Sequence, residues 1–335
     1  MASAPAIATT TGSAHTRISG IGAYRPRRVV PNSEIVEAID SSDEWIQERS
    51  GIKTRHFAGD GESVVDMSEA ASRDALAMAG IEPKDVDAVV LATVSHPYQT
   101  PAAAPIVADR LGAGNPAAFD ISAACAGYCH GISLAHDMVR GGSARHVLVI
   151  GVERLSDFTS PTDRGTAFIF GDGAGAAVVS PSDTPQIGPT VWGSEGDKWR
   201  VISQNESWTE MRDQDLGWPT IGMQGQSVFR WAVWGMAPVA QKALDAAGVT
   251  ADQLDAFIPH QANIRIIDAM CKQLRMPEHV VVARDIVDSA NTSAASVPLA
   301  TERLLREGQV GSGALALQIG FGAGLSYAAQ VVVLP

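Results

Sequence analysis

Two stretches of the chain repeat one another, and this repeat limits the possible folds more than any other feature. Residues 75–90 read ALAMAGIEPKDVDAVV and residues 243–258 read ALDAAGVTADQLDAFI, so a helix, a glycine stop, an aspartate and a strand follow at the same spacing. A second pair, SAACAGYCHGISLA at 122–135 and SANTSAASVPLA at 289–300, leads in each case to a strand that reads VLVIG or ALQIG. Chance similarity between two alanine-rich helices is the alternative, but several matches in the same order make chance the weaker explanation. We therefore predict two duplicated halves.

The first half alternates between strands and helices, as an α/β fold requires. We expect strands over residues 17–24, 86–94 and 146–152 and helices over residues 32–39, 68–80 and 103–111. Residues 1–16 are rich in alanine, threonine and serine and lack lysine and arginine, which predicts a flexible tail rather than a signal peptide. The predicted N-terminal half then spans residues 17–185 and the C-terminal half residues 186–335.

Cys125 stands where an apolar run, FDI at 119–121, gives way to small residues and a predicted helix. The first N–H groups of a helix are unpaired and carry partial positive charge, which favours a thiolate over a thiol. Cys125 is therefore a candidate nucleophile, and its alanine and glycine neighbours leave room for a substrate carbonyl. A buried free cysteine that acts as a small apolar residue is the alternative.

Composition narrows the possible partners and the compartment. A net charge of −12 without a large basic block argues against nucleic acid and anionic membranes as partners. The hydrophobic content of 45% supports a soluble protein with large buried cores. Three cysteines, an odd number, favour a reducing, cytoplasmic setting over a disulfide framework, and no histidine cluster completes a metal site.

The last residues, 308–335, contain no charged side chain and have the length of a membrane span. Polar residues interrupt the run, and the sequence GFGAG at 320–324 divides it. Two buried strands joined by a glycine turn explain the pattern better than a membrane helix.

The duplication predicts where the chemistry lies. In two halves related by a pseudo-twofold axis, equivalent strand ends and helix starts face each other, and open α/β sheets bind their ligands at such ends. Cys125 would then lie near His260, in IPHQAN, and near Asn291, in NTS. A histidine held in a structural hydrogen bond and a helix cap or glycosylation sequon are the alternatives for these two residues.

Five motifs together resemble the β-ketoacyl-acyl carrier protein synthase III family of the thiolase superfamily, over nearly the whole chain from about residue 17. They are IPHQAN with His260, NTSAAS with Asn291, DISAACAG with Cys125, GDGAGA at 171–176 and GFGAG at 320–324. The resemblance implies a five-layered αβαβα sandwich of two thiolase-like halves, and a homodimer.

The resemblance also implies a reaction. Cys125 would accept the acyl group of a short acyl-CoA, and malonyl-acyl carrier protein would then lose carbon dioxide and condense to 3-ketoacyl-acyl carrier protein. Hydrogen bonds from His260 and Asn291 would stabilise the enolate, and the backbone N–H groups of Cys125 and Ala323 would form a second oxyanion hole. No metal and no cofactor is expected, because CoA enters as the thioester substrate.

Other positions match the family's binding residues. The residues expected to bind CoA are Trp45, Arg49, Arg164 and Asn263, with Trp45 and Arg164 on the adenine, Arg49 near the phosphates and Asn263 also ordering a water near His260. Phe229 is expected to line the acyl pocket beside Cys125. Arg230, Arg265 and Lys272 are expected to form a basic patch for the acidic carrier protein. An interfacial tryptophan and ordinary solvated basic residues are the alternatives.

One departure from the family concerns Ala290, which precedes Asn291 where glycine is common, and its effect on that loop stays open. Residues 96–105 resemble the segment that bounds the acyl pocket across the dimer interface, and their small side chains favour short straight or branched starters. The main rival function is a priming synthase that loads an unusual starter in a polyketide pathway. A degradative thiolase is a weaker alternative, because the second cysteine of such enzymes is missing near GFGAG. A non-catalytic binding protein is also weaker, because all three reactive residues are present. An acyltransferase or esterase relative is the last alternative, and Asn291 favours decarboxylation over it.

Overall fold

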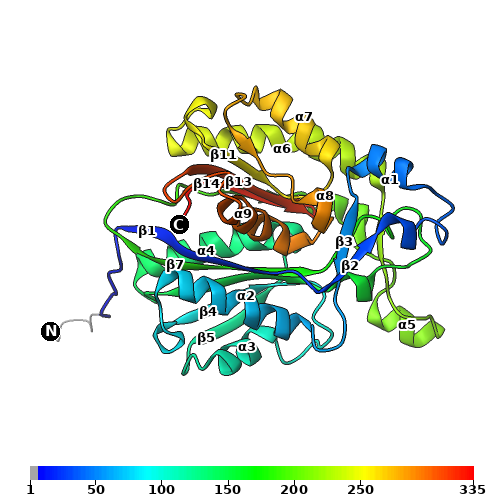
Figure 1. Cartoon of the computed structure of the whole chain (residues 1–335). Coiled ribbons are helices and arrows are strands. Elements are labelled where there is room, and N and C mark those ends of the chain that lie inside the picture. The colour runs from blue at the N-terminus through cyan, green and yellow to red at the C-terminus, as the bar shows by residue number, and fades with distance from the viewer. Residues whose placement is uncertain (1–6) are drawn as a thin grey trace.

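Two five-stranded sheets form the centre of the structure, a computed structural model that describes residues 7–335 (Figure 1). The first sheet has the strand order β1-β7-β6-β4-β5. Its strands are β1 (His15–Tyr24), β4 (Ala88–Ala92), β5 (Ala117–Ile121), β6 (Val147–Glu153) and β7 (Gly173–Ser182). Strand β4 runs parallel to β5 and β6, whereas β7 runs antiparallel to β6 and β1.

The second sheet has the order β12-β11-β13-β14-β8. Read in this direction, its strands correspond to the order β5-β4-β6-β7-β1 of the first sheet. Its strands are β8 (Val191–Ser194), β11 (Ala256–Pro259), β12 (Val281–Val282), β13 (Leu315–Gly322) and β14 (Ser326–Val333). Strand β11 runs parallel to β12 and β13, whereas β14 runs antiparallel to β13 and β8. The matching order and directions confirm the predicted duplication, and strands β13 and β14 confirm the two buried strands expected at the end of the chain.

Helices fill three layers around the two sheets (Figure 1). Helices α4 (Gly127–Gly141) and α9 (Ser296–Arg306) lie between the sheets, where they share one apolar core with strands of both halves. Helices α2 (Val64–Ala79) and α3 (Ala103–Leu111) cover the outer face of the first sheet. Helices α6 (Gly225–Ala247) and α7 (Ile264–Leu274) cover the outer face of the second. The result is the expected thiolase-like αβαβα sandwich.

Seven shorter elements of the described chain lie outside the two sheets and the six helices that cover them. They are β2 (Arg28–Pro31), α1 (Asp43–Ser50), β3 (Thr54–Phe57), β9 (Ile202–Gln204), α5 (Trp208–Gln214), β10 (Ile221–Met223) and α8 (Ile286–Ser289). Strand β2 pairs with β3, and β9 pairs with β10.

The repeated glycine stops act as the sequence predicts. Gly80 ends α2 and Gly248 ends α6, both in the left-handed conformation, with φ of 65° and 68°. Glycine adopts this conformation without the penalty that a Cβ atom brings. The same helix end therefore precedes β4 and β11.

The prediction of a helix over residues 32–39 is wrong. Only a short 3-10 turn forms, at Asn32–Glu34. The Asn32 side chain does not cap a helix, because its amide donates instead to Asp43 Oδ1 at 2.6 Å and to Ile52 O at 2.8 Å. These bonds tie the segment to both ends of α1.

The predicted N-terminal tail lies partly outside the described residues, which begin at residue 7. Within its described part, Thr10 Oγ1 donates to Gly141 O at 2.6 Å and Ser13 N donates to Val139 O at 3.2 Å. Strand β1 already begins at His15, because this residue pairs with Ser182. Among the helices of residues 7–335, none combines the length and apolar character needed to cross a bilayer.

Candidate active site

A cavity of about 1200 Å³ brings together residues of both halves. Of the residues predicted as site residues, those that line it are Trp45, Arg49, Cys125, Arg164, Phe229, Arg230, His260, Asn263, Arg265, Asn291 and Ala323. Lys272 is not among the lining residues; it is exposed in the last turn of α7.

Two equivalent turns meet beside this cavity. Cys125 lies in the 3-10 turn Ala124–Ala126 that leads into α4, and the turn Ser293–Ala295 leads into α9 in the same way. Both turns begin with a residue in a left-handed conformation, Ala124 with φ of 44° and Ser293 with φ of 47°. The duplication therefore places Ala294 at the position that corresponds to Cys125.

Glycines in the strands let each turn approach the opposite half. A Cβ atom on Gly151 of β6 would lie 2.2 Å from Ala294 O, and one on Gly320 of β13 would lie 2.9 Å from Cys125 O. These two glycines end the matching runs VLVIG and ALQIG. The repeated glycine is thus the local reason that the two turns meet.

The Cys125 sulfur is enclosed closely by backbone and a hydroxyl. A Cβ atom on Gly322 would lie 2.8 Å from the sulfur, so only glycine leaves it room. Burial raises the pKa of Cys125 to about 12, although the Ser293 hydroxyl and the backbone N–H groups of Cys125 and Ala323 lower it. The local N–H groups therefore favour the thiolate, as expected, but desolvation outweighs them, so the thiol is the favoured form at neutral pH.

His260 follows β11 and is held by the backbone and by α9. Its N–H donates to Ile319 O at 2.7 Å, and Nδ1 lies 2.6 Å from Ser296 Oγ. Because Gln261 N donates to that same oxygen at 3.4 Å, the Ser296 proton is free to point at Nδ1, which leaves the ring proton on Nε2. Burial lowers the pKa of His260 to about 3, so the ring is a neutral donor.

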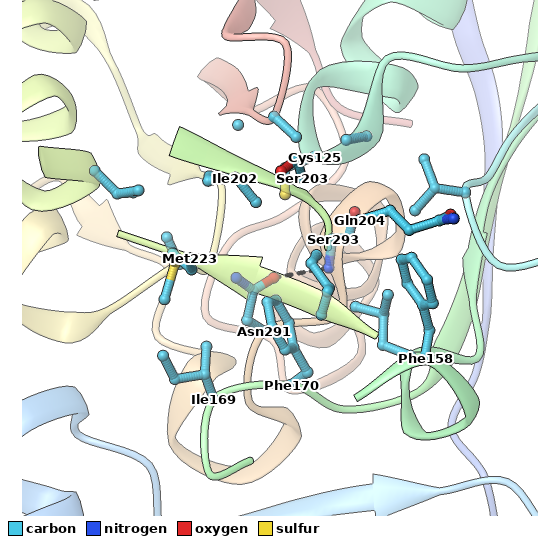
Figure 2. A pocket seen from close by; sticks show the side chains of 18 of the residues that line it. Cys125, Phe158, Ile169, Phe170, Ile202, Ser203, Gln204, Met223, Asn291 and Ser293 are labelled. Carbon is cyan, nitrogen blue, oxygen red and sulfur yellow. Dashed lines mark hydrogen bonds between the residues drawn. The ribbon is translucent and has the colours of Figure 1, made fainter. Parts of the chain in front are cut away.

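Asn291 is fixed from both sides of its backbone and through its side chain. Its N–H donates to Ile169 O at 2.9 Å, and its carbonyl accepts from Gly171 N at 3.0 Å. Its Oδ1 accepts from Ser293 N at 2.8 Å, the dashed contact in Figure 2. The amide Nδ2 is therefore the group left to donate into the cavity.

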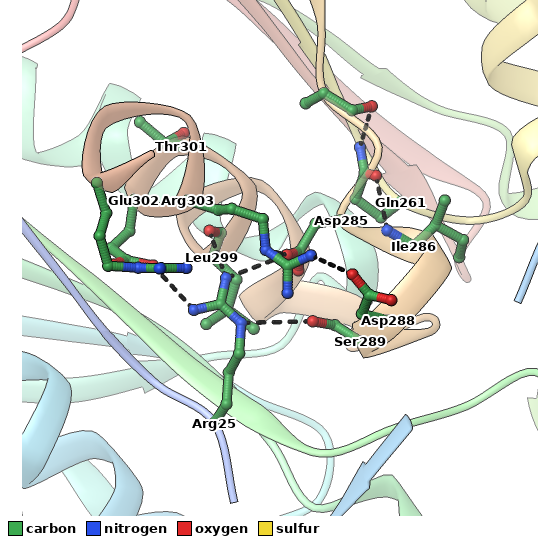
Figure 3. A network of polar contacts seen from close by, with 12 residues as sticks. Arg25, Gln261, Asp285, Ile286, Asp288, Ser289, Leu299, Thr301, Glu302 and Arg303 are labelled. Carbon is green, nitrogen blue, oxygen red and sulfur yellow. Dashed lines mark hydrogen bonds and ion pairs between the residues drawn. The ribbon is translucent and has the colours of Figure 1, made fainter. Parts of the chain in front are cut away.

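Polar contacts hold α8, which leads directly into Asn291 (Figure 3). Arg25 Nη2 lies 3.1 Å from Asp285 Oδ1, and Arg303 Nε lies 2.6 Å from the same buried oxygen. Gln261, next to His260, accepts from Ile286 N at 3.0 Å. The segments that carry His260 and Asn291 are thus joined to each other and, through Arg25, to the first half.

The residues expected to bind CoA form another part of the cavity wall. The Cζ atoms of Arg49 and Arg164 lie 5.5 Å and 5.0 Å from the centre of the Trp45 ring. Asn263 caps α7, and its Nδ2 donates to Arg49 O at 2.9 Å. Arg265 lies over the Phe229 ring at 5.1 Å. An aromatic surface flanked by arginines suits a base and its phosphates.

Family models match most of the second half of the chain and part of the first. A model described as 3-oxoacyl-[acyl-carrier-protein (ACP)] synthase III matches residues 119–196, and one for the C-terminal part of the same enzyme matches residues 244–334. β-Ketoacyl-[acyl-carrier-protein] synthase III 1 of Streptomyces coelicolor is 61% identical over 335 residues, covering 97% of this chain and 98% of the relative. The chain belongs to the β-ketoacyl-acyl carrier protein synthase III family.

Solved structures of synthase III enzymes and relatives have the same fold. The priming β-ketosynthase of the R1128 polyketide biosynthetic pathway has a TM-score of 0.96 at 49% identity, covering 99% of both chains. The 3-oxoacyl-[acyl-carrier-protein] synthase III of Aquifex aeolicus has a TM-score of 0.88 at 37% identity, covering 95% of this chain and 99% of that one. These matches confirm the resemblance inferred from the five motifs.

Sequence reasoning missed several residues of this synthase III site. The wall beside Cys125 and Asn291 includes apolar and polar side chains that no motif identified (Figure 2): Phe158, Ile169, Phe170, Ile202, Ser203, Gln204 and Met223. Ser293 and Glu153 were also missed. A usable signal existed for both, because Ser293 lies inside NTS and Glu153 is the one charged residue of the apolar strand VLVIGVE.

Proposed function

We propose that this chain acylates Cys125 with a short acyl-CoA and then condenses that acyl group with malonyl-acyl carrier protein, as β-ketoacyl-acyl carrier protein synthase III. One observation carries the proposal: Cys125 shares a cavity with the free donors of His260 and Asn291, which come from the opposite half. A nucleophile facing two neutral donors suits a decarboxylating condensation.

In the acylation step the sulfur attacks the thioester carbonyl and CoA leaves. The carbonyl oxygen becomes negative, and the N–H groups of Cys125 and Ala323 are proposed to hold it. Both backbone groups already lie at the sulfur, where they lower its pKa.

In the decarboxylation step negative charge develops on the thioester oxygen of the malonyl group. His260 Nε2 and Asn291 Nδ2 are proposed to donate to this oxygen. Because both groups are neutral, they gain their full interaction only as the charge appears. The resulting carbanion attacks the acyl carbonyl, and Cys125 leaves with 3-ketoacyl-acyl carrier protein as the product.

We further propose a homodimer that uses the edge strand β5. This strand lies at the end of the first sheet, and its sequence AAFDI is mainly apolar. Phe119 is 38% exposed on it. Exposed apolar edge strands are normally covered in soluble proteins, and a second copy would provide the cover.

The other proposed roles follow from the cavity lining and from the exposed side chains of α7. We propose that Trp45, Arg49, Arg164 and Asn263 bind CoA, that Phe229 lines the acyl pocket and that Arg230, Arg265 and Lys272 meet the carrier protein. We propose no cofactor. We propose a cytoplasmic location for the protein. The boundary between the two halves is proposed to lie between residues 185 and 186.

Priming of a polyketide pathway is the second candidate function. The observation that favours it is the similarity to the R1128 priming β-ketosynthase, at 49% identity. The two functions share their reacting residues and differ in the acyl group that is loaded.

Intact-protein mass spectrometry with a panel of straight and branched acyl-CoAs tests both functions. We expect a mass gain at Cys125 that disappears with carbon dioxide release when malonyl-acyl carrier protein is added. The best-loading acyl group separates fatty acid initiation from specialised priming. Transfer that persists in Cys125→Ala would overturn the assigned nucleophile, and no adduct from any acyl-CoA would overturn the proposed donor.

A further inference from the structure

Glu153, at the end of β6, is a fully buried carboxylate next to the proposed nucleophile. Its Oε2 accepts hydrogen bonds from Ser95 Oγ at 2.6 Å, Val94 N at 3.1 Å and Thr93 Oγ1 at 3.2 Å. Its Oε1 accepts from Ser293 Oγ, at 3.1 Å. Across residues 7–335, no lysine, arginine or histidine forms an ion pair with it. A buried carboxylate without a counterion is costly, so its position calls for a function.

The Ser293 hydroxyl connects this carboxylate to Cys125. It donates to Glu153 Oε1, and it lines the same cavity as Cys125, at the start of the turn that corresponds to the Cys125 turn. It also lowers the pKa of the Cys125 thiol. A hydroxyl has one proton and two lone pairs, so with its proton on the Glu153 side a lone pair is available to accept the proton of the Cys125 thiol. The hydroxyl is therefore the group that links the thiol to the carboxylate.

We propose that Glu153 takes up the Cys125 proton through the Ser293 hydroxyl when the sulfur attacks the acyl donor. The S–H bond of Cys125 breaks as its proton bonds to Ser293 Oγ, while the proton that Ser293 carried moves to Glu153 Oε1. The products are a thiolate and a neutral carboxyl, and the cluster keeps its single negative charge. Glu153 acts through Ser293 and is therefore a positioning residue, not a group that touches substrate.

The proton remains on Glu153 in the acyl-enzyme. The departing CoA thiolate takes its proton from water, and the Cys125 thiolate released by condensation recovers its own from Glu153 through Ser293. A neutral Glu153 also removes negative charge from beside the cavity while the malonyl carboxylate and its enolate occupy it. The inference rests on the proposed role of Cys125 as nucleophile.

The surroundings of Glu153 suit reversible proton uptake near neutral pH. Burial raises its pKa to about 7, although its hydrogen bonds with Ser95, Val94, Ser293 and Thr93 lower it. Opposite it on β7 is Gly173, which has no side chain. The titratable and charged groups nearby are Cys125, His96 after Ser95, Arg154 paired with Asp157, Asp172 beside Gly173, and His260 across the cavity. Burial also raises the pKa of Asp172, to about 6, but Asp172 accepts from Ser156, whereas Glu153 is the carboxylate that accepts from Ser293.

Glu153→Gln distinguishes a proton relay from a carboxylate that acts only through its charge, because the two predict opposite changes in the rate of acylation. The Glu153 charge raises the pKa of Cys125, so a passive carboxylate predicts that Gln speeds acylation. The relay predicts that acylation at pH 7 falls about 100-fold, as for loss of a general base, and that the rise in rate near pH 7 disappears. Single-turnover acylation by acetyl-CoA, followed by intact mass from about pH 5 to about pH 9, measures both.

Ser293→Ala tests the relay without changing the carboxylate. Ala124 has the same left-handed φ at the matching position of the first half, so alanine suits this backbone. We expect the same loss of rate and of the inflection near pH 7. The matched control is Ser156→Ala, which removes a 2.6 Å bond from serine to another buried carboxylate, Asp172, away from the cavity lining. We expect the control to acylate within about threefold of the wild type.

The outcomes separate the relay from the proposed function. Wild-type protein that gains no acyl group on Cys125 contradicts the function. Wild-type protein that is acylated, together with a Glu153→Gln variant that is acylated at least as fast, overturns the relay alone. If Glu153→Gln does not fold, as judged by its melting curve, an unchanged pH profile in Ser293→Ala overturns the relay instead.

Discussion

Cys125 and His260 are both held in their neutral forms by burial. The pKa of the thiol rises to about 12 and that of the imidazole falls to about 3, chiefly because both are desolvated. The two groups therefore do not form a resting ion pair. A neutral histidine suits hydrogen-bond donation to an enolate, and a neutral thiol needs a proton acceptor before it can attack.

His260→Ala should separate the two chemical steps. We expect decarboxylation of malonyl-acyl carrier protein to fall by about 10²- to 10³-fold, because one oxyanion donor is lost. Acylation should change less, because the proposed relay leads to Glu153. Carbon dioxide release and acyl-adduct formation, measured on the same preparation, test this. Equal losses in both steps would show that His260 mainly activates Cys125.

Asn291→Asp removes the Nδ2 donor and adds a negative charge. The carboxylate still provides an acceptor for Ser293 N, but the Nδ2 donor is replaced by an oxygen. We expect decarboxylation to fall by at least about 10²-fold, because one donor is lost and the added charge repels the enolate. The melting temperature should also fall, because an ionised carboxylate is costly at this buried position. Undiminished carbon dioxide release would remove Asn291 from the mechanism.

The low pKa of His260 makes stability depend on pH. Between its ordinary value of 6.5 and about 3, the unfolded chain binds a proton that the folded chain does not. The free energy of unfolding should therefore fall as the pH falls through this window. We expect His260→Gln, which takes up no proton, to lose less stability between about pH 7 and about pH 5 in urea unfolding. Glu153 has a raised pKa and the opposite effect, but it is present in both proteins. Equal losses would contradict the prediction.

Among the elements, the loop after α8 has a strained backbone at Ala290. Ala290 has φ of 57° and ψ of −159°, a region that normally requires glycine. Ala290 therefore adopts the backbone conformation that glycine, common at this position in the family, would adopt without strain. Such a residue is tolerated where surrounding contacts hold it, and Asn291 is held on both sides by bonds to Ile169 and Gly171.

Ala290→Gly should stabilise the protein. Relief of the backbone cost, about 1–3 kcal/mol, exceeds the greater entropy of glycine in the unfolded chain, about 1 kcal/mol. We expect a rise in the urea midpoint with acylation retained. The control is Ala295→Gly, at an ordinary helical φ of −78°, which should lower the midpoint instead. A midpoint lowered in both variants would show that Ala290 is not strained.

Across the whole molecule, the site exists because two halves approach through their glycines. Gly151 and Gly320 each admit the turn of the other half. The same contacts that stabilise the core therefore also place Cys125, Ser293 and Glu153 close to one another. Stability and acylation should depend together on this contact.

Gly151→Ala should damage both properties. Its Cβ atom would meet backbone, which cannot rotate away, so we expect a loss of about 3 kcal/mol in the free energy of unfolding and a large loss of acylation. Gly311→Ala is the control, because a Cβ atom there meets nothing within 4 Å. Urea unfolding and intact-mass acylation measure both variants. A Gly151→Ala protein as stable as the control would contradict the close contact.

Local patterns predicted much of the fold, and the motifs identified three residues that the structure brings to one cavity. Apolar runs identified β4, β6, β13 and β14, and the glycines at 80 and 248 identified two helix ends, because strand burial and helix termination depend on neighbouring residues. The helix expected over 32–39 failed, because the Asn32 side chain found distant partners instead of capping a helix.

The repeat and its motifs were sufficient to infer two halves that bring Cys125, His260 and Asn291 together, because both depend on residue type and spacing. Protonation states and close contacts depended on the assembled fold. Burial by residues far apart in the chain determines the pKa of Cys125, and the approach of a distant turn determines the contact at Gly151. The path from Cys125 through Ser293 to Glu153 joins three separate segments, and only their packing reveals it.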